Sequence, residues 1–561
     1  MYNRNKWLPV AGLVALLAIS VWFLNTGFAG NEQLYFKTDK GLFYLKQVFE
    51  TISRDYVDEV DPEELSKSAI KGIVRELDPY TVFFEKKGSE RLEMITKGKY
   101  GGLGMEISKR DGKVTVISPI DNTPAQRAGI RAGDAITKIN GEPTKELSLD
   151  KASSKLRGKA GTQVTLEIER PGFDKPITLT LTREEIVLKD VTYADFVAPG
   201  TAFIRLTSFS NKAASELKQA IRDLQQKGKI ESVVLDLRRN PGGLLQSAVE
   251  VANVFIPKGN LIVQTRGFHE QENKFMTSEK ALLPDVPLVV LVDGGSASAS
   301  EIVAGAIQDL DRGVVLGEST FGKGLVQQVH PIDKINDAYL KITTAKYYVP
   351  SGRCIQKEDY KKDKKVFTDA SDTTDFDNHI KYHTQNGRLV YGGGGIQPDI
   401  TVKREKIDKY LMTLWAGGHL FRFTVDYLAS HPELKLHNQL RVSDEILEAF
   451  HEFLKRKELN FEIEGEPELK KFLKIASEQK YSDDVQDLVK VALQKLDMEK
   501  STAFEHHKDK IREALEAEFA EKIGGSKART ATNLRNDNFL SAALEVLNNQ
   551  QKYNQILAIK E

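Results

Sequence analysis

The chain has 561 residues, of which 40% are hydrophobic and 29% charged, the balance of ordinary globular domains. At roughly 100–200 residues per domain, this length predicts three to five domains. Lys+Arg and Asp+Glu are both 80, so bulk charge lacks the basic excess typical of a nucleic-acid-binding protein. Cys354 is the single cysteine, which excludes an internal disulfide and a cysteine-based zinc site.

The N-terminus carries an uncharged apolar run over residues 8–24, preceded by Arg4 and Lys6. The run is near the short limit of a spanning helix and longer than a usual signal-peptide core. A small-x-small sequence before Gly30 is an acceptable cleavage site. We expect residues 1–30 to be a signal peptide or a membrane anchor, with a buried core helix as the alternative. Because the positive charges precede the run, the rest should lie on the non-cytoplasmic (periplasmic) side.

Residues 31–95 have the spacing of helices. Apolar side chains recur three or four positions apart, as on one helix face, at Leu42, Leu45, Val48, Phe49, Ile52, Leu65, Ile70, Ile73 and Leu77. We expect an N-terminal helical region that ends near Asp78.

Residues 96–185 have a different pattern from the helical region before them. Short β-rich runs at 114–117, 135–139 and 164–168 are separated by glycine-containing turns. A short helix fits between them at 149–156. This pattern predicts a small β-rich domain.

From residue 186 to 400, buried strands alternate with helices. Val233–Leu237 is followed by a glycine turn and an amphipathic helix, and Leu288–Val292 repeats this order before a third strand begins at Val314. Such alternation predicts βαβ units and a largely parallel sheet. Functional sites in these sheets lie at the carboxyl ends of the strands, where both glycine turns fall.

The remaining segments are less informative. Residues 355–390 are charged and weakly patterned, which predicts a surface insertion. Residues 401–561 have helical patterns: Ser443 is a good helix start, and an apolar face follows it. We expect a C-terminal helical extension.

Gly294-Gly-Ser-Ala-Ser-Ala-Ser300 is the most unusual stretch of the chain. Small residues after a buried strand permit a tight turn, and a serine at a helix N-terminus is placed to attack a substrate while nearby amides stabilise negative charge. The alternative is that these serines only cap the helix. The stretch lacks the final glycine of the hydrolase elbow G-x-S-x-G.

Gly317-Glu-Ser-Thr-Phe-Gly-Lys-Gly324 is the second candidate. It approaches the phosphate loop G-x-x-x-x-G-K-[ST], but Gly324 replaces the hydroxyl residue that would hold magnesium, which disfavours nucleotide binding. A lysine in a dry site loses its proton more easily and can serve as a base. The alternative is that Lys323 is an ordinary exposed charge.

In chain order, four motifs resemble the C-terminal processing (tail-specific) serine proteases over about residues 40–400. They are a PDZ-like segment, Asp236-Leu-Arg-x-Asn240-x-Gly-Gly243, Ser296-Ala-Ser-Ala-Ser-Glu301 and Phe321-Gly-Lys-Gly324. The resemblance implies a crotonase-like α/β protease core over residues 186–400 with an inserted PDZ domain over 96–185, and a serine endopeptidase without metal or organic cofactor. The segment from Cys354 to Gly395 and the region 401–561 depart from the shorter family pattern.

The resemblance also implies the roles of individual residues. Ser298, the middle serine of its motif, corresponds to the nucleophile and Lys323 to the general base. Gln327 occupies the place of a glutamine that orients the lysine. Backbone amides would form the oxyanion hole, contributed by Ala299 and the turn at Gly242 and Gly243, while Ser296 and Ser300 would be structural.

The PDZ-like segment contains Tyr100-Gly-Gly-Leu-Gly-Met105, which resembles the carboxylate-binding loop of PDZ domains. Successive amides in a glycine loop can capture a terminal carboxylate, and an adjoining strand edge can pair with the peptide. The alternative is a plain structural hairpin. The expected tail-binding residues are Gly102, Leu103, Gly104, Met105 and Leu156.

Three rival functions remain open at this point. His330 could replace Lys323 as the base, the chain could be an inactive PDZ adaptor, or it could be an acyl-CoA enzyme of the crotonase type. The presence of both Ser298 and Lys323 disfavours the adaptor, and the apolar N-terminus and PDZ-like motif disfavour the acyl-CoA enzyme. Expected partners are protein or peptide substrates with free C-termini and the membrane through residues 1–30, but no nucleic acid. A homo-oligomer or an adaptor protein is left open.

Overall fold

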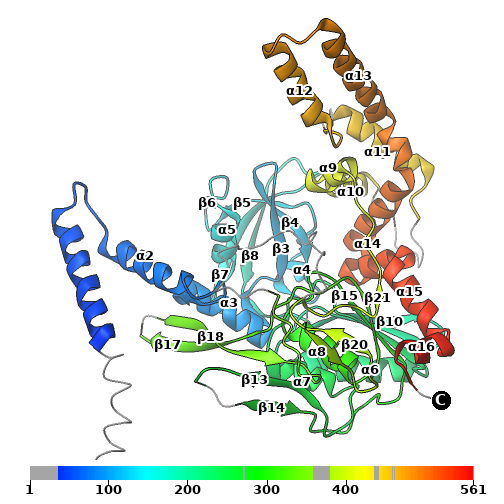
Figure 1. The fold of residues 1–561 in the computed structure, drawn as a ribbon. Helices are drawn as coiled ribbons and strands as arrows, with labels where there is room; N and C mark the ends of the chain where they lie inside the picture. Colours follow the sequence, from blue (N-terminus) through cyan, green and yellow to red (C-terminus); the bar gives the residue numbers. More distant parts are fainter. Residues whose placement is uncertain are drawn as a thin grey trace, which may run out of the picture. The chain divides into compact units, whose positions relative to one another are not determined.

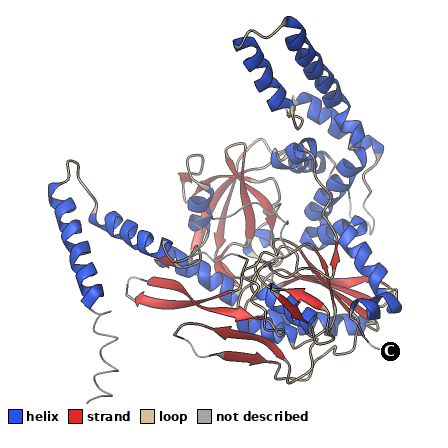
Figure 2. Cartoon of the chain, viewed as in Figure 1, coloured by secondary structure: helices blue, strands red, loops and turns tan. Residues whose placement is uncertain are grey.

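The computed structural model describes residues 36–269, 272–335, 337–357, 380–431, 433–434, 441–457, 459 and 461–559. The apolar run at 8–24 lies outside these residues, so the structure does not test it. The chain divides into two compact units, residues 1–83 with 340–342, and residues 84–339 with 343–561. Figures 1 and 2 show the helices and strands of each unit.

The first unit is helical in its described part. A helix covers residues 36–55 and is followed by α2 (Pro62–Arg75). The side chain of Asp61 caps α2 by accepting the amide of Glu63, and proline in the first turn suits a helix start. The predicted helical N-terminal region is therefore observed.

The predicted β-rich domain is present at the start of the second unit, after α3 (Lys86–Lys97). Antiparallel pairing gives the strand order β3-β4-β5-β7-β8, with β6 beside β5 and a separate β2–β9 pair. The strands are β2 (Lys99–Gly102), β3 (Met105–Arg110), β4 (Lys113–Pro119), β5 (Ala135–Ile139), β6 (Glu142–Pro143), β7 (Gln163–Glu169), β8 (Ile177–Thr182) and β9 (Glu184–Val187). Helices α4 (Pro124–Arg127) and α5 (Leu149–Leu156) complete the domain. β3 forms one edge of its sheet.

The predicted parallel sheet forms the core of the second unit. Its order is β10-β11-β12-β15-β16-β21; only the β10–β11 pair is antiparallel. The strands are β10 (Val191–Ala198), β11 (Thr201–Leu206), β12 (Ser232–Asp236), β15 (Leu288–Val292), β16 (Val314–Gly317) and β21 (Ile400–Thr401). α6 (Ala213–Lys227), α7 (Leu245–Ala252) and α8 (Ala299–Asp309) pack in the apolar core on one face.

A second, antiparallel group of strands flanks this core. β13 (Leu261–Arg266) pairs with β14 (Asn273–Met276) and with β18 (Ala338–Tyr348), which also pairs with β17 (Leu325–Asp333). β17 begins directly after the glycine–lysine motif, so its start fixes the end of that loop.

Residues 355–390 were expected to form a weakly patterned surface insertion, but the C-terminal end of this segment has regular structure. β19 (Lys381–His383) and β20 (Leu389–Tyr391) form a hairpin. Between them Arg388 donates to Asp311 and Asp399 at 2.5 Å each. These buried ion pairs were not visible in the local sequence, because both carboxylates lie outside the segment. Residues 358–379 lie outside the described part of the chain.

The C-terminal region is helical, as predicted. The helices are α9 (Lys409–Ala416), α10 (His419–Ser430), α11 (Asp444–Arg456), α12 (Glu466–Glu478), α13 (Asp483–His506), α14 (Lys508–Asn533), α15 (Asn538–Leu547) and α16 (Gln550–Ile556), with a 3₁₀ turn, η2 (Leu534–Asn536). Ser443 caps α11, accepting the amide of Ile446. Among the described residues, no helix has the length and apolar character needed to cross a bilayer.

The last two helices are part of the protease core rather than an appendage. Phe539, Leu540 and Val546 of α15 share one buried cluster with side chains of β11, β12, β15 and β16. The hydroxyl of Tyr553 in α16 donates to the carbonyl oxygen of Leu288 at 3.2 Å and accepts the amide of Leu288 at 3.0 Å. The parallel sheet is therefore covered by α6–α8 on one face and by α15–α16 on the other.

The C-terminal helices also contact the β-rich domain. Arg422 of α10 donates to the carboxylate of Asp111 at 2.5 Å, and the guanidinium of Arg110 lies 5.9 Å from the ring centre of Phe421. These contacts attach α10 to the turn between β3 and β4.

Candidate active site

Three loops meet at the carboxyl edge of the parallel sheet. They follow β12, β15 and β16, and contain Asn240–Gly243, Asp293–Ser298 and Phe321–Gly324. The first loop lies directly on the second, because a Cβ placed on Gly242 would be 2.9 Å from Ser298 Cβ and 2.8 Å from the amide of Ala299. The φ of Gly242 is +96°, a backbone conformation that favours glycine. Both this conformation and the lack of space for a side chain therefore require glycine at position 242.

Ser298 lies at the junction between the loop and α8. Its φ of 56° and ψ of −111° are unusual for a non-glycine residue. Such backbone strain persists only where the surroundings fix it, and it is concentrated at functional sites. Ser298 is partly exposed, whereas its neighbours Ala297 and Ala299 are buried. The turn therefore presents the serine at the surface of a packed loop.

Glu301 joins the serine loop to the lysine loop. One carboxylate oxygen accepts the amides of Ser298 and Lys323 at 2.7 and 2.9 Å. The other oxygen accepts the hydroxyl of Thr320 and the amide of Gly322 at 2.6 and 2.7 Å. Ser298 and Lys323 are thus held by one side chain, although they are far apart in the sequence.

The burial of Glu301 is complete, with 0% of its surface exposed. Burial raises the pKa of this carboxyl to about 7, although its four hydrogen bonds act in the opposite direction. The role of the Glu301 carboxylate was not predicted from the sequence. Ser298-x-x-Glu301 has the sequence form of a capping box, which could have indicated the hydrogen bond from the amide of Ser298 to Glu301.

Tyr347 makes a second connection between the same two residues. Its buried hydroxyl hydrogen-bonds to the carbonyl oxygens of Ser298, at 3.1 Å, and of Lys323. Tyr347 lies in β18, so the antiparallel strand group also helps to fix the site. Nothing in the local sequence around this tyrosine indicates the contact.

The two outer serines of the motif have structural hydrogen bonds. Ser296 Oγ donates to the carbonyl of Leu237 at 2.8 Å, and Ser300 Oγ donates to the carbonyl of Asn240 at 2.8 Å. Both residues are fully buried. They attach the serine loop to the loop after β12, the role that was expected for them.

The two glycines expected to supply oxyanion donors differ in their hydrogen bonding. The amide of Gly242 donates to Asn240 Oδ1 at 2.9 Å, so it is occupied. Among the residues that the structure describes, the amides of Gly243 and Ala299 have no hydrogen-bond partner. The glycine turn therefore offers Gly243, not Gly242, as an unoccupied donor, because the side chain of Asn240 takes the first amide.

Gln327 and His330 both lie on β17. The amide nitrogen of Gln327 is 3.4 Å from Thr343 Oγ1, a long hydrogen bond to the neighbouring strand. His330 is exposed. The orienting role of Gln327 stays a prediction.

The glycine loop of the β-rich domain directs its carbonyl groups inward. The carbonyl of Leu103 accepts the amide of Ala125 at 2.9 Å, and that of Gly104 accepts the amide of Ile120 at 2.9 Å. Gly104 has φ of +76° and lies against Thr123, where no side chain would fit. Leu103 and Leu156 are buried in the same cluster, and Met105 packs against it at the start of edge strand β3.

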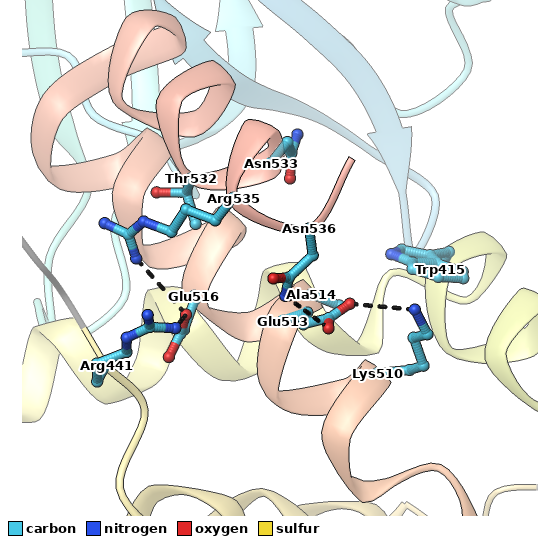
Figure 3. A pocket seen from close by; sticks show the side chains of 10 residues that line it. All are labelled: Trp415, Arg441, Lys510, Glu513, Ala514, Glu516, Thr532, Asn533, Arg535 and Asn536. Carbon is cyan, nitrogen blue, oxygen red and sulfur yellow. Dashed lines mark hydrogen bonds and ion pairs between the residues drawn. The ribbon is translucent and has the colours of Figure 1, made fainter. Parts of the chain in front are cut away.

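No group of three or more potential metal ligands occurs in the described part of the chain. A cavity of about 170 Å³ lies among the C-terminal helices, lined by residues of α9, α14 and η2 and by Arg441 (Figure 3). It contains none of the residues proposed from the sequence.

Comparison with known proteins assigns each region. The chain matches the family model of peptidase family S41 over residues 200–366 and a PDZ domain over 115–170. Residues 26–88 match the N-terminal domain of the activating protease CtpB, and residues 410–547 match the C-terminal helical domain of probable PDZ-proteases.

The chain is also similar to individual proteins. The carboxy-terminal-processing protease of Bartonella bacilliformis is 42% identical over 330 residues, which cover 58% of this chain and 74% of that protein. A probable CtpA-like serine protease of Staphylococcus aureus is 33% identical over 451 residues, 78% of this chain and 84% of the relative. The solved photosystem II D1 C-terminal processing protease is 28% identical, with 64% of this chain and 92% of that chain covered at a TM-score of 0.34.

Together these findings define a multidomain serine peptidase that carries a PDZ domain and helical terminal domains. The chain belongs to peptidase family S41, the carboxy-terminal processing proteases. The predicted family, fold class and enzyme class are confirmed.

Proposed function

We propose that the enzyme is an endopeptidase in which Ser298 is the nucleophile and Lys323 the general base, acting on proteins whose C-terminal tails bind the PDZ domain. The observation that carries this proposal is the pair of connections between the two residues. Glu301 accepts both of their amides, and Tyr347 hydrogen-bonds to both of their carbonyl groups. Such double fixation is what a nucleophile and its base require.

The reaction then follows acyl-transfer chemistry. Ser298 Oγ attacks the peptide carbonyl while its proton passes to neutral Lys323 Nζ. The amides of Ala299 and Gly243 stabilise the oxyanion, and Lys323 returns the proton to the leaving amine as the peptide bond breaks. Water then attacks the acyl-serine ester, with its proton passing through Lys323 to Ser298. Gln327 is proposed to orient the lysine.

Recognition of the tail is proposed at Gly102–Met105 and edge strand β3. The loop carbonyls are turned into the domain, which leaves the opposite side of the loop for a carboxylate. β3 has an unpaired edge in its sheet, to which an extended peptide can add as a further strand. Leu156 of α5, which packs beside β3, is proposed to line the side-chain pocket.

The test compares peptide cleavage by the wild-type enzyme and by a variant that lacks the proposed nucleophile. Incubation of the enzyme with a quenched peptide that ends in a free apolar residue should give products with a new C-terminus, identified by mass spectrometry. Ser298→Ala should give none while retaining the folded circular dichroism spectrum. Unchanged cleavage by folded Ser298→Ala would refute the assignment of the nucleophile.

We also propose that the catalytic domains lie on the non-cytoplasmic side of a membrane, with residues 1–30 as signal or anchor. The apolar run at 8–24 and the charges at Arg4 and Lys6 support this orientation. A compartment-sensitive reporter fused after Glu561 tests it, and a reporter active in the cytoplasm would contradict it.

A further inference from the structure

An ion pair joins the end of β12 to the beginning of α15. Asp537, which precedes α15, accepts hydrogen bonds from two nitrogens of Arg238 at 3.1 and 2.7 Å. The two residues are 299 positions apart in the sequence. Both side chains are largely buried, at 12% and 14% exposed. A bidentate pair of this kind is geometrically specific and is not easily replaced by water.

Arg238 lies between two carboxylates. On its other side it donates to both oxygens of Asp236, at 2.8 and 2.9 Å. Burial alone would lower the pKa of Arg238, but the carboxylates of Asp236 and Asp537 outweigh burial and raise this pKa above its ordinary value. The guanidinium therefore stays charged. The ring centre of Phe539, in the first turn of α15, lies 5.0 Å from the same guanidinium. The cation is thus enclosed by β12 on one side and by the C-terminal helices on the other.

The residues on both sides of Arg238 belong to the loop beside the nucleophile. The carbonyl of Leu237 accepts Ser296 Oγ at 2.8 Å, and the amide of Arg239 donates to Asp293 at 2.8 Å. Asn240 then holds the amide of Gly242 at 2.9 Å and accepts Ser300 Oγ at 2.8 Å. Leu237, Arg239 and Asn240 therefore attach the segment that leads into the turn of Gly242 and Gly243 to the serine loop.

Asp537 is itself fixed by its surroundings. It caps α15 by accepting the amides of Phe539 and Leu540 at 2.9 and 3.1 Å. The preceding turn η2 is held by two contacts to α14 (Figure 3). Asn536 of η2 donates to Glu513 at 2.7 Å, and Arg535 of η2 lies 3.8 Å from Glu516. The carboxylate therefore presents a fixed charge to Arg238.

We propose that Asp537 is a positioning residue for peptide hydrolysis, which holds Arg238 and thereby the oxyanion turn at Gly242–Gly243 against Ser298. This inference builds on the proposed function and adds to it a residue of the C-terminal helical domain. Oxyanion donors act on charge that develops in the transition state, so their displacement lowers kcat more than it raises KM. Tail binding occurs in a different domain and is not affected.

Asp537→Asn separates this role from capping. Asparagine is as good an N-cap as aspartate, but it removes the negative charge and one of the two acceptors that face Arg238. With a quenched peptide that ends in a free apolar residue, we expect full-length Asp537→Asn to lose about tenfold in kcat, with KM unchanged within about twofold. Asp537→Glu, which keeps the charge, should recover part of that loss.

Tyr553→Phe is the matched control. It removes two hydrogen bonds between α16 and Leu288, at the opposite end of the strands from the active site. It should lower the melting temperature but leave kcat unchanged. If Asp537→Asn behaves in the same way, Asp537 is only structural and the inference is overturned. If Asp537→Asn does not fold, Asp537→Ser takes its place, because serine keeps an N-cap oxygen but removes the charge that faces Arg238. Wild-type kcat and KM in folded Asp537→Ser overturn the inference.

The proposed function is tested separately in the same experiment. Inactive Ser298→Ala together with fully active Asp537→Asn refutes only the role of Asp537. Wild-type activity in folded Ser298→Ala refutes the proposed function itself.

Discussion

The serine loop of the protease core and the glycine loop of the PDZ domain are built from similar parts, but they are supported differently. Both use small residues after or before a strand, and both place backbone amides where a negative charge could bind. The serine loop is surrounded by buried hydrogen bonds from Glu301, Tyr347 and Asn240. The PDZ loop instead leads into the edge strand β3, which has a strand partner on one side only.

This difference fits the roles proposed for the two loops. Peptide hydrolysis requires atoms to be held close to the transition-state geometry, so additional support increases the rate. Tail recognition requires an extended peptide to enter and to form hydrogen bonds with a strand, so an edge must stay accessible. Substitutions in the core should therefore change kcat, and changes at the substrate tail should change binding.

The largest effect is expected at the proposed dyad. Ser298→Ala and Lys323→Ala should each lower kcat by at least about 10³-fold, since the nucleophile and the base act as one unit. For the same reason the double variant should be no less active than either single variant. Peptide cleavage and thermal melting measure activity and folding in parallel, and a double variant with an additive loss would show that the two residues act independently.

Glu301→Gln should have the next largest effect. Glutamine offers one acceptor oxygen and places an NH₂ group against amides that also donate, so two of the four contacts are lost. We expect roughly a 10²-fold fall in kcat with little change in KM. Thr320→Val removes only one contact to the same carboxylate and should cost clearly less. Equal losses in both variants would count against a role for Glu301 in aligning the two loops.

The free carboxylate of the substrate should matter less. Hydrogen bonds to a charged group are worth roughly 1.5–3 kcal/mol, so amidation of the C-terminus should lower kcat/KM by at least about tenfold. The effect should appear in KM and should disappear when residues 96–185 are deleted, provided that the variant folds. Identical rates for the acid and the amide in the intact enzyme would contradict tail capture and leave the dyad unaffected.

The smallest effect concerns stability and pH. Because the pKa of Glu301 rises from 4.5 to about 7 on folding, the folded state binds more protons than the unfolded state between these values. The contribution of Glu301 to the free energy of unfolding is therefore greatest below pH 4.5 and is lost as the pH rises to about 7. Denaturant titrations should show this slope in the wild type and a weaker slope in Glu301→Gln. An unchanged slope would assign the pH dependence to other groups.

Much of the fold could be predicted because its elements have local signals. The apolar run Leu288–Val292 and the short helix Leu149–Leu156 have the predicted bounds, since a glycine turn or a capping serine delimits each. The order of motifs was enough to identify the family and the candidate dyad. Ser298 and Lys323 each lie in a short glycine- or serine-rich sequence that follows a buried strand.

The supports of the site could not be predicted in the same way. Tyr347 and Asp537 are ordinary residues in their local sequence, and their roles arise from contacts across the fold. The occupied amide of Gly242 depends on the rotamer of Asn240, which no sequence pattern specifies. The region 401–561 was expected to be helical, but only the structure shows that α15 packs on the far face of the protease sheet.

The covering of that sheet by α15 has a consequence for the synthesis of the enzyme. Strand β16 ends at Gly317 and α15 begins at Asn538, roughly 220 positions later. At roughly 5–20 residues per second, a ribosome needs on the order of 10–40 s between these points. During this interval one apolar face of the sheet lacks its cover, and Arg238 lacks Asp537. A nascent chain should therefore have lower proteolytic activity until its C-terminal helices emerge and cover the sheet.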